Sequence, residues 1–131
     1  MRPAFEFRLD QRSGVPAYRQ IIDQVLGAIA SGSLRAGDQL PTVRQLAVDL
    51  QINPNTVVRA YRELEIREIL ETQQGTGTFI SQKKVKQSEA ERHRRLSQIA
   101  GEVLARAGTE GFTLDELLQC LENISKQERR A

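Results

Sequence analysis

The spacing of apolar residues predicts a chain built mainly from helices. Apolar side chains recur at three- and four-residue steps in several stretches, as on a helix with one buried face. The first such stretch begins near Pro16, runs through Ile29 and stops at Ser31-Gly32. Before it, apolar and charged residues alternate over residues 5–9, a pattern that predicts a short, half-buried strand.

Two short helices are expected in the middle of the chain, each with a clear start. Thr42 followed three residues later by Gln45 forms a capping box, which satisfies two backbone N–H groups at a helix start. Asn53 as the N-cap and Pro54 at the first helical position mark the second start. Only residues 51–52 separate the two helices, so the pattern predicts a helix-turn-helix.

A β-hairpin is expected directly after these helices. Residues 69–80 contain two β-prone runs around a turn with Gly75 and Gly77. Glycine allows positive φ and close backbone approach, so the tip of this hairpin is able to lie against a sugar-phosphate backbone or in a minor groove. A hairpin in this place is typical of the wing of a winged helix, and an ordinary tight hairpin is the alternative.

The C-terminal part predicts a basic linker and a pair of helices. Ser88 with Glu91 and Thr113 with Glu116 are spaced as capping boxes, the residues between 108 and 111 break the helical pattern, and a solvated tail is expected from Ser125.

A lone pair of helices of this size buries its apolar stripes poorly and is marginal in stability. We therefore expect residues 83–131 to be a dimerisation region that forms a symmetric four-helix arrangement with a second copy. The alternative is that the two helices fold back on the first domain, residues 1–82. The residues predicted to form the dimer contact are Leu96, Ile99, Val103, Leu114, Leu117, Leu118 and Leu121.

Charge changes this picture only through its distribution. The 131 residues carry 19 Lys and Arg against 17 Asp and Glu, and the small excess gathers between Lys83 and Arg95. Residues 1–82 are neutral, so a basic face there requires acidic residues such as Asp49 and Glu63 to lie away from the arginines.

The sequence gives little support to an enzyme, a metal site or a membrane protein. Cys120 is the one cysteine, which excludes an internal disulfide, and no paired Cys/His spacing suits a metal. His93 lies in a run of arginines typical of a solvated helix face, and Cys120 has the helical spacing of a half-buried core thiol. No apolar run has the length of a signal peptide or a membrane span. We expect a cytoplasmic protein without cofactor, metal or membrane partner.

The outer face of the second short helix carries the candidate DNA contacts. Asn, Thr and Arg side chains at the start of a recognition helix read base edges or hold phosphates in a major groove. Asn53, Asn55 and Thr56 lie at this start, and Arg59 and Arg62 lie further along the same helix. The alternative is that Asn53 and Thr56 only cap the helix.

Several motifs occur in one uninterrupted order between about Pro16 and Ser81, and they resemble a known family. They are Pro16-x-Tyr18-x-Gln20-Ile21, Gly37-Asp38-Gln39-Leu40-Pro41-Thr42-Val43-Arg44-Gln45-Leu46-Ala47, Asn53-Pro54-Asn55-Thr56-Val57, Ala60-Tyr61-Arg62-Glu63-Leu64-Glu65 and Gly75-Thr76-Gly77-Thr78-Phe79-Ile80. Together they resemble the DNA-binding domain of the GntR family of bacterial transcriptional regulators. The short two-helix tail is similar to that of the YtrA-like branch of this family.

This resemblance implies a winged helix-turn-helix followed by a two-helix dimerisation hairpin. It implies a homodimer that binds double-stranded DNA at a palindromic operator in its own operon, often beside transporter genes. We expect a repressor, because a small DNA-bound domain blocks polymerase sterically, and the sequence does not specify whether a small-molecule effector exists. The family's contacts map to Arg44, to the start of the recognition helix and to the wing tip. The predicted DNA-binding residues are Arg44, Asn53, Asn55, Thr56, Arg59, Arg62, Gly75, Thr76 and Gly77.

The sequence departs from the family pattern in three places. Glu68 stands where a glycine is usual before the wing, so a non-glycine residue is expected at positive φ unless the helix runs on. The wing tip around Gly75 lacks the two arginines common in relatives, and Ala36 replaces a usual proline. The neutral tip leaves open a second function, a winged-helix interaction module that binds RNA or a protein partner.

Overall fold

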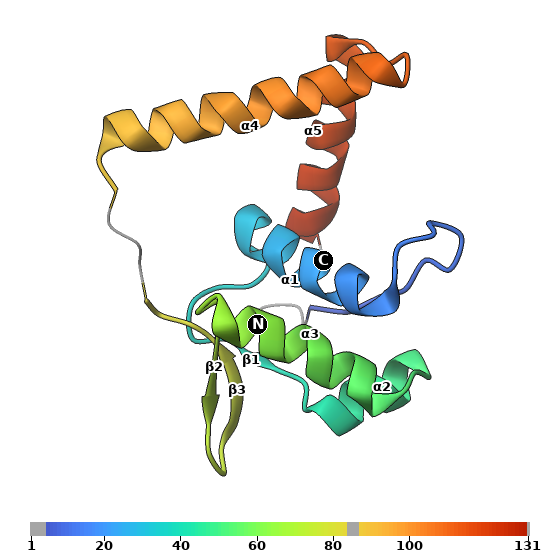
Figure 1. Cartoon of the computed structure of the whole chain (residues 1–131), viewed down its shortest axis with the longest axis vertical. Helices are drawn as coiled ribbons and strands as arrows, with labels where there is room; N and C mark the ends of the chain where they lie inside the picture. The colour runs from blue at the N-terminus through green and yellow to red at the C-terminus, as the bar shows by residue number, and fades with distance from the viewer. Residues whose placement is uncertain (1–4, 84–86, 131) are drawn as a thin grey trace. The chain divides into compact units, whose positions relative to one another are not determined.

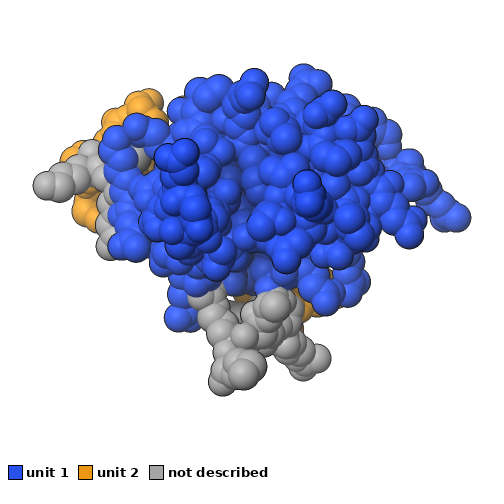
Figure 2. Space-filling model, turned by 90° about the horizontal axis from the view of Figure 1, so that it is seen from below, with its two compact units in different colours: residues 1–83, 131 blue, residues 84–130 orange. Residues whose placement is uncertain are grey.

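The computed structural model describes residues 5–83 and 87–130, which form two compact units. The first unit ends at Lys83 and the second continues to Arg130, and Figure 2 distinguishes the two by colour. Lys84 and Lys86 of the expected basic linker lie outside the described residues. A mainly helical chain with a small sheet is the predicted fold class, and it is confirmed.

The first unit has three helices and a small antiparallel sheet, as a winged helix does (Figure 1). The helix starts follow the predicted signals: Thr42 and Gln45 form a complete capping box, and Asn53 caps the next helix with Pro54 behind it. The elements are α1 (Ala17–Ser31), β1 (Gln39–Leu40), α2 (Val43–Leu50), α3 (Pro54–Ile66), β2 (Leu70–Gln73) and β3 (Gly77–Ile80).

The core of this unit lies among the three helices and one side of the sheet. The helix α3 packs against α1, α2 and β2, and its Tyr61 hydroxyl donates a hydrogen bond of 2.8 Å to the carbonyl of Pro41, just before α2. This bond and the apolar contacts fix the angle between the two helices of the helix-turn-helix. The buried cluster consists of Ile21, Ile22, Val25, Ala28, Leu34, Leu40, Leu46, Ala47, Val57, Ala60, Tyr61, Leu64, Leu70 and Ile80.

The strand expected over residues 5–9 is wrong. Phe5 and Phe7 do pack against the core while the residues between them are exposed, which explains the alternating pattern. Among the described residues, however, the backbone of residues 5–9 pairs with no strand, because glutamine side chains of α1 take its hydrogen bonds. The N–H of Arg8 donates to Gln24 Oε1 at 2.8 Å, and the N–H of Asp10 donates to Gln20 Oε1 at 2.8 Å.

The third strand of the sheet is instead β1, which lies between α1 and α2. Gln39 pairs with Phe79 and Leu40 with Thr78, giving the strand order β1-β3-β2. Glu68, which stands where a glycine is usual in the family, adopts the predicted positive φ, at 63°. Gln51 adopts the same left-handed conformation, with φ 56°, in the turn between α2 and α3.

The second unit consists of the helices α4 (Glu89–Thr109) and α5 (Leu114–Arg130). The capping box at Thr113 and Glu116 is confirmed by reciprocal hydrogen bonds of 3.0 and 3.1 Å. At Ser88 only half of the predicted box forms, because the Glu91 side chain pairs with Arg94 and Arg95 instead. The tail expected from Ser125 is not separate from the helix, since α5 continues to Arg130, but Lys126 and Gln127 are exposed to solvent as predicted.

Candidate nucleic-acid interface

The elements of the predicted DNA-binding surface lie around one helix. Figure 1 shows α1 on one side of α3, and α2 with the tip of the hairpin on the other. The predicted contact residues come from α2, the start of α3 and the turn between β2 and β3. The N-terminus of α3 also carries the positive end of the helix dipole, which favours a phosphate.

The start of α3 combines helix capping with an exposed polar side chain. Asn53 Oδ1 accepts a hydrogen bond of 2.8 Å from the N–H of Asn55, so the capping function proposed as the alternative is present. Asn55 is exposed and Thr56 is half-buried. Of these three predicted residues, Asn55 is therefore the one whose side chain is most available to a ligand.

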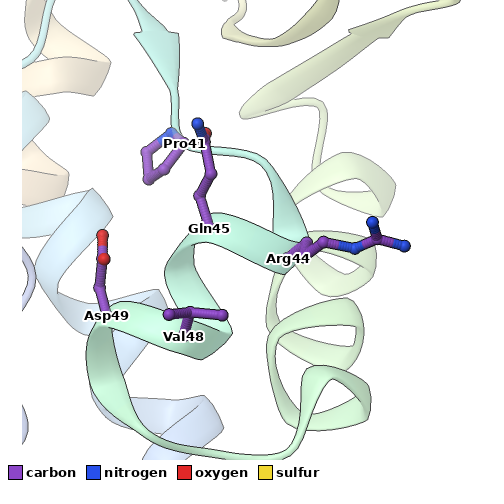
Figure 3. A pocket seen from close by; sticks show the side chains of 5 residues that line it. All are labelled: Pro41, Arg44, Gln45, Val48 and Asp49. Carbon is purple, nitrogen blue, oxygen red and sulfur yellow. The ribbon is translucent and has the colours of Figure 1, made fainter.

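Arg44 projects from the exposed face of α2. It lines a shallow hollow together with Pro41, Gln45, Val48 and Asp49. Figure 3 shows its guanidinium pointing away from the Asp49 carboxylate. Among the described acidic side chains, none forms an ion pair with Arg44. Its guanidinium therefore stays available for a phosphate or a base edge.

Arg59 is held by two neighbours that the sequence pattern did not reveal. Its guanidinium carbon lies 3.7 Å from the centre of the Tyr18 ring in α1, a cation–π contact. Its Nε lies 3.8 Å from Glu63 Oε1, one turn along α3. Glu63 therefore does not lie away from the arginines, as a basic face would require, because it is close to Arg59. Arg62, on the same helix, is exposed.

The wing tip is narrow, polar and built on glycine. Gly75 has φ 79° and open space around it, whereas Gly77 has φ 139° and closely approaches Gln39 of β1. The Gln39 amide donates a hydrogen bond of 3.2 Å to the carbonyl of Thr76. Sequence reasoning placed Gly75, Thr76 and Gly77 in the wing but did not identify Gln39.

The base of the wing is fixed by polar contacts. Lys83 Nζ donates to Glu68 Oε1 at 2.8 Å, and this hydrogen bond raises the pKa of Lys83. Ser81 Oγ donates to Glu71 Oε1 at 2.9 Å. Deeper in the unit, burial raises the pKa of Tyr61, so its hydroxyl stays protonated as the donor to Pro41. These contacts support the wing and α3 without reducing the charge of Arg44.

The second unit exposes the side chains predicted to form a dimer contact. Among its described side chains only Ala107 is buried, and Leu96 is 65% exposed. The remaining residues of the predicted contact are exposed except Leu117, which is half-buried. Cys120, expected to be half-buried, is exposed as well. The structure of the single chain therefore leaves an apolar surface on α4 and α5.

The basic junction at the start of α4 is weaker than its sequence indicates. Glu91 accepts hydrogen bonds from both Arg94, at 2.8 Å, and Arg95, at 2.9 Å, and these bonds lower the pKa of Glu91. A carboxylate that stays ionised neutralises part of the arginine charge there. The main candidate contacts to DNA accordingly lie in the first unit.

The described residues give no structural support to a metal centre or a membrane span. No group of three or more His, Cys, Asp or Glu side chains is placed to hold a metal ion. Of the helices in the described ranges, none combines the length and apolar character needed to cross a bilayer.

These features define the class of protein as a winged helix-turn-helix protein, and comparison with known proteins specifies the family. A sequence model described as "Bacterial regulatory proteins, gntR family" matches residues 17–80. The HTH-type transcriptional repressor YtrA of Bacillus subtilis (strain 168) is 48% identical over 75 residues, which cover 57% of this chain and 58% of the relative. The matched segment thus spans less than two thirds of that relative's length.

Two solved structures extend the similarity beyond the winged helix. YtrA from Sulfolobus acidocaldarius, described as a GntR-family transcription factor, is 32% identical with a TM-score of 0.56, and the match covers 76% of this chain and 97% of that one. A transcriptional antiterminator from Listeria monocytogenes EGD-e is 27% identical with a TM-score of 0.69, covering 95% of this chain and 92% of that one. The chain belongs to the GntR family. Its named relatives are transcriptional regulators rather than enzymes.

Proposed function

We propose that the chain is a sequence-specific transcriptional regulator of the bacterial cytoplasm. It acts as a homodimeric repressor that binds an inverted-repeat operator in its own operon, with transporter genes among its targets. The observation that carries this proposal is that a single winged helix of a GntR-family chain presents the guanidinium of Arg44, the polar start of α3 and a glycine-based wing. These are the parts with which such a fold reads duplex DNA.

Each part has a distinct physical task in this proposal. The start of α3 enters the major groove, where Asn55 meets base edges and the helix N-terminus favours a phosphate. Arg44 on α2 binds the phosphate backbone and fixes the register of α3. The wing turn of Gly75 to Gly77 lies against the DNA beside the half-site.

Dimer formation is supported by the exposed apolar faces of α4 and α5. A second copy that covers these faces gives two winged helices on one symmetric particle, and a symmetric particle matches an inverted repeat. Repression is supported by sterics, because a winged helix bound across a promoter excludes polymerase from it. The relative from Bacillus subtilis is named a repressor.

The test is selection from a library of randomised duplex DNA. We expect the protein to enrich an inverted repeat and to bind it with a steep salt dependence, because phosphate contacts release counterions. No enriched sequence would overturn the proposal. If an RNA hairpin competes for the protein as well as the selected duplex does, the result would favour the alternative function, an interaction module that binds RNA.

Arg44→Ala tests the site, with Arg12→Ala as the matched control. Both residues are exposed arginines of the first unit, but Arg12 lies in the turn before α1. We expect Arg44→Ala to weaken binding to the selected duplex by about 5- to 100-fold, because charge-assisted hydrogen bonds to a phosphate are lost, and to lower the salt dependence of binding. Arg12→Ala should bind as the wild type does. Equal effects of the two substitutions, or a large drop in melting temperature for Arg44→Ala, would remove Arg44 from the interface.

A further inference from the structure

On the β2 side the backbone holds the wing tip, with the N–H of Thr76 donating to the carbonyl of Gln73 at 2.9 Å, whereas on the β1 side the tip is held by a side chain. The strand β1 pairs with β3 only at Gln39 with Phe79 and Leu40 with Thr78. If the pairing continued, Pro41 and Thr42 would lie opposite Gly77 and Thr76. Pro41 has no N–H to donate, and the N–H of Thr42 donates to the Gln45 side chain at 3.0 Å in the capping box. The start of α2 therefore removes the backbone donors with which an extended β1 would hold the tip.

Gln39 supplies the missing donor. Its side chain lies diagonally across Gly77, and Nε2 donates to the carbonyl of Thr76 at 3.2 Å. A Cβ built on Gly77 would lie 2.5 Å from Nε2 and 3.4 Å from Cδ, so the amide occupies the space where any other residue would place its side chain. The hydrogen bond from Gln39 therefore requires glycine at position 77, because any side chain there would displace the amide.

The wing tip is uncharged, so its contacts to DNA depend on exact placement. The exposed residues Gln73, Gln74 and Thr76 carry no charge. A charged wing is attracted to DNA over roughly the Debye length of about 8 Å at physiological salt. A neutral wing acts only through hydrogen bonds and close contact, which need donor and acceptor within about 3 Å. A small displacement therefore costs a neutral tip its contacts.

We infer that Gln39 is the positioning residue of the wing. By holding the Thr76 carbonyl, it fixes the direction in which the tip leaves the sheet, and so places the tip against the DNA that flanks each half-site. Gln39 itself does not touch DNA in this account. The inference rests on the proposed DNA-binding function and adds to it how a wing without arginines remains effective.

The test is Gln39→Met, which keeps the length of the side chain and its neutral charge but removes the donor. Gln82→Ala is the control, because Gln82 is an exposed glutamine whose amide lies near Gly37 rather than at the tip. On the duplex that the wild type selects, we expect Gln39→Met to lower affinity by about 3- to 30-fold, since a few hydrogen bonds are lost. Hydroxyl-radical footprinting should show loss of the flanking protection, with the protection of the half-site core retained.

A second measurement does not depend on DNA. In the free protein, backbone ¹⁵N relaxation should show lower order parameters for Gly75 to Gly77 in Gln39→Met than in the wild type or in Gln82→Ala. Unchanged order at the tip, or an unchanged footprint, would overturn the inference. Parallel loss of core and flanking protection, together with a lower melting temperature, would also overturn it, because Gln39 would then support the whole unit. If the wild type selects no duplex, the proposed function fails, and the relaxation data alone decide whether Gln39 holds the tip.

Discussion

The two units of this chain treat their apolar residues in opposite ways. In the first unit, the residues Ile21, Val57 and Leu64 are 0% exposed, and they belong to a closed core among three helices and a sheet. In the second, the large apolar side chains of α4 and α5 lie mostly on the surface, with Ile99 at 56% exposure. The first unit thus buries its large apolar side chains within a single chain, whereas the second leaves its own exposed, as the proposed dimer requires.

This difference assigns separate tasks to the two units. A closed core holds α3 and the wing in a fixed geometry, which reading a DNA sequence requires. An uncovered apolar face is stabilised by association, because burial removes apolar area from water at about 25 cal/mol per Å². Substitutions in the two units should therefore affect different measured quantities.

The largest expected effect comes from a charge placed in the exposed apolar face. Leu121→Glu should raise the dissociation constant of the proposed homodimer by about a thousand-fold, because symmetry places two carboxylates in an apolar contact. Sedimentation equilibrium measures this dissociation constant. Gln119→Glu is the control, since it puts the same charge on the opposite side of α5. A dimer that tolerates Leu121→Glu would assign the apolar face to another role.

A cavity in the first unit should have the next largest effect. Leu64→Ala in α3 should lower the free energy of unfolding by about 3 kcal/mol, independent of protein concentration, because Leu64 is fully buried. Ile99→Ala in α4 should instead have an effect that grows with protein concentration, since a partner chain covers Ile99 in the proposed homodimer. Denaturant unfolding at two protein concentrations compares the free energies of unfolding of the two variants. A concentration-independent loss of several kcal/mol in Ile99→Ala would show that the second unit is closed without a partner.

The smallest effect is expected where the core of the first unit reaches its surface. Tyr18→Leu keeps apolar contact but removes the ring face below Arg59, and should cost about 0.5–1 kcal/mol of stability. Tyr18→Phe, which keeps the face, is the control and should change little. Thermal melting measures both. Equal melting temperatures for the wild type, Tyr18→Leu and Tyr18→Phe would show that the ring does not hold Arg59, which would then be available to bind DNA.

Signals that are local in sequence predicted the fold well. The capping box at Thr42 and Gln45, the N-cap at Asn53 and the glycines of the wing each act within a few residues, and each appears in the structure as expected. The apolar periodicity likewise placed the five helices. The family motifs are local too, which is why the resemblance covered the winged helix so completely.

The failed strand at residues 5–9 and the half-formed capping box at Ser88 share one physical cause, which is competition from residues far along the chain or on the next turn. Residues 5–9 alternate as a strand does, yet Gln20 and Gln24 of α1 take their backbone hydrogen bonds. Arg94 and Arg95 take the Glu91 carboxylate away from the predicted capping box. At the candidate site, Tyr18 holds Arg59 and Gln39 holds the wing tip across separations that no spacing rule describes.

The central claim is that two closed winged helices act together through the apolar faces of their second units. The most direct measurement is the stoichiometry and affinity of the complex on the selected inverted repeat and on a duplex with one half-site, by sedimentation at physiological salt. The account predicts two chains on the full site and an affinity at least about 100-fold weaker for the single half-site. One chain per duplex, with equal affinity for the two DNAs, would contradict it.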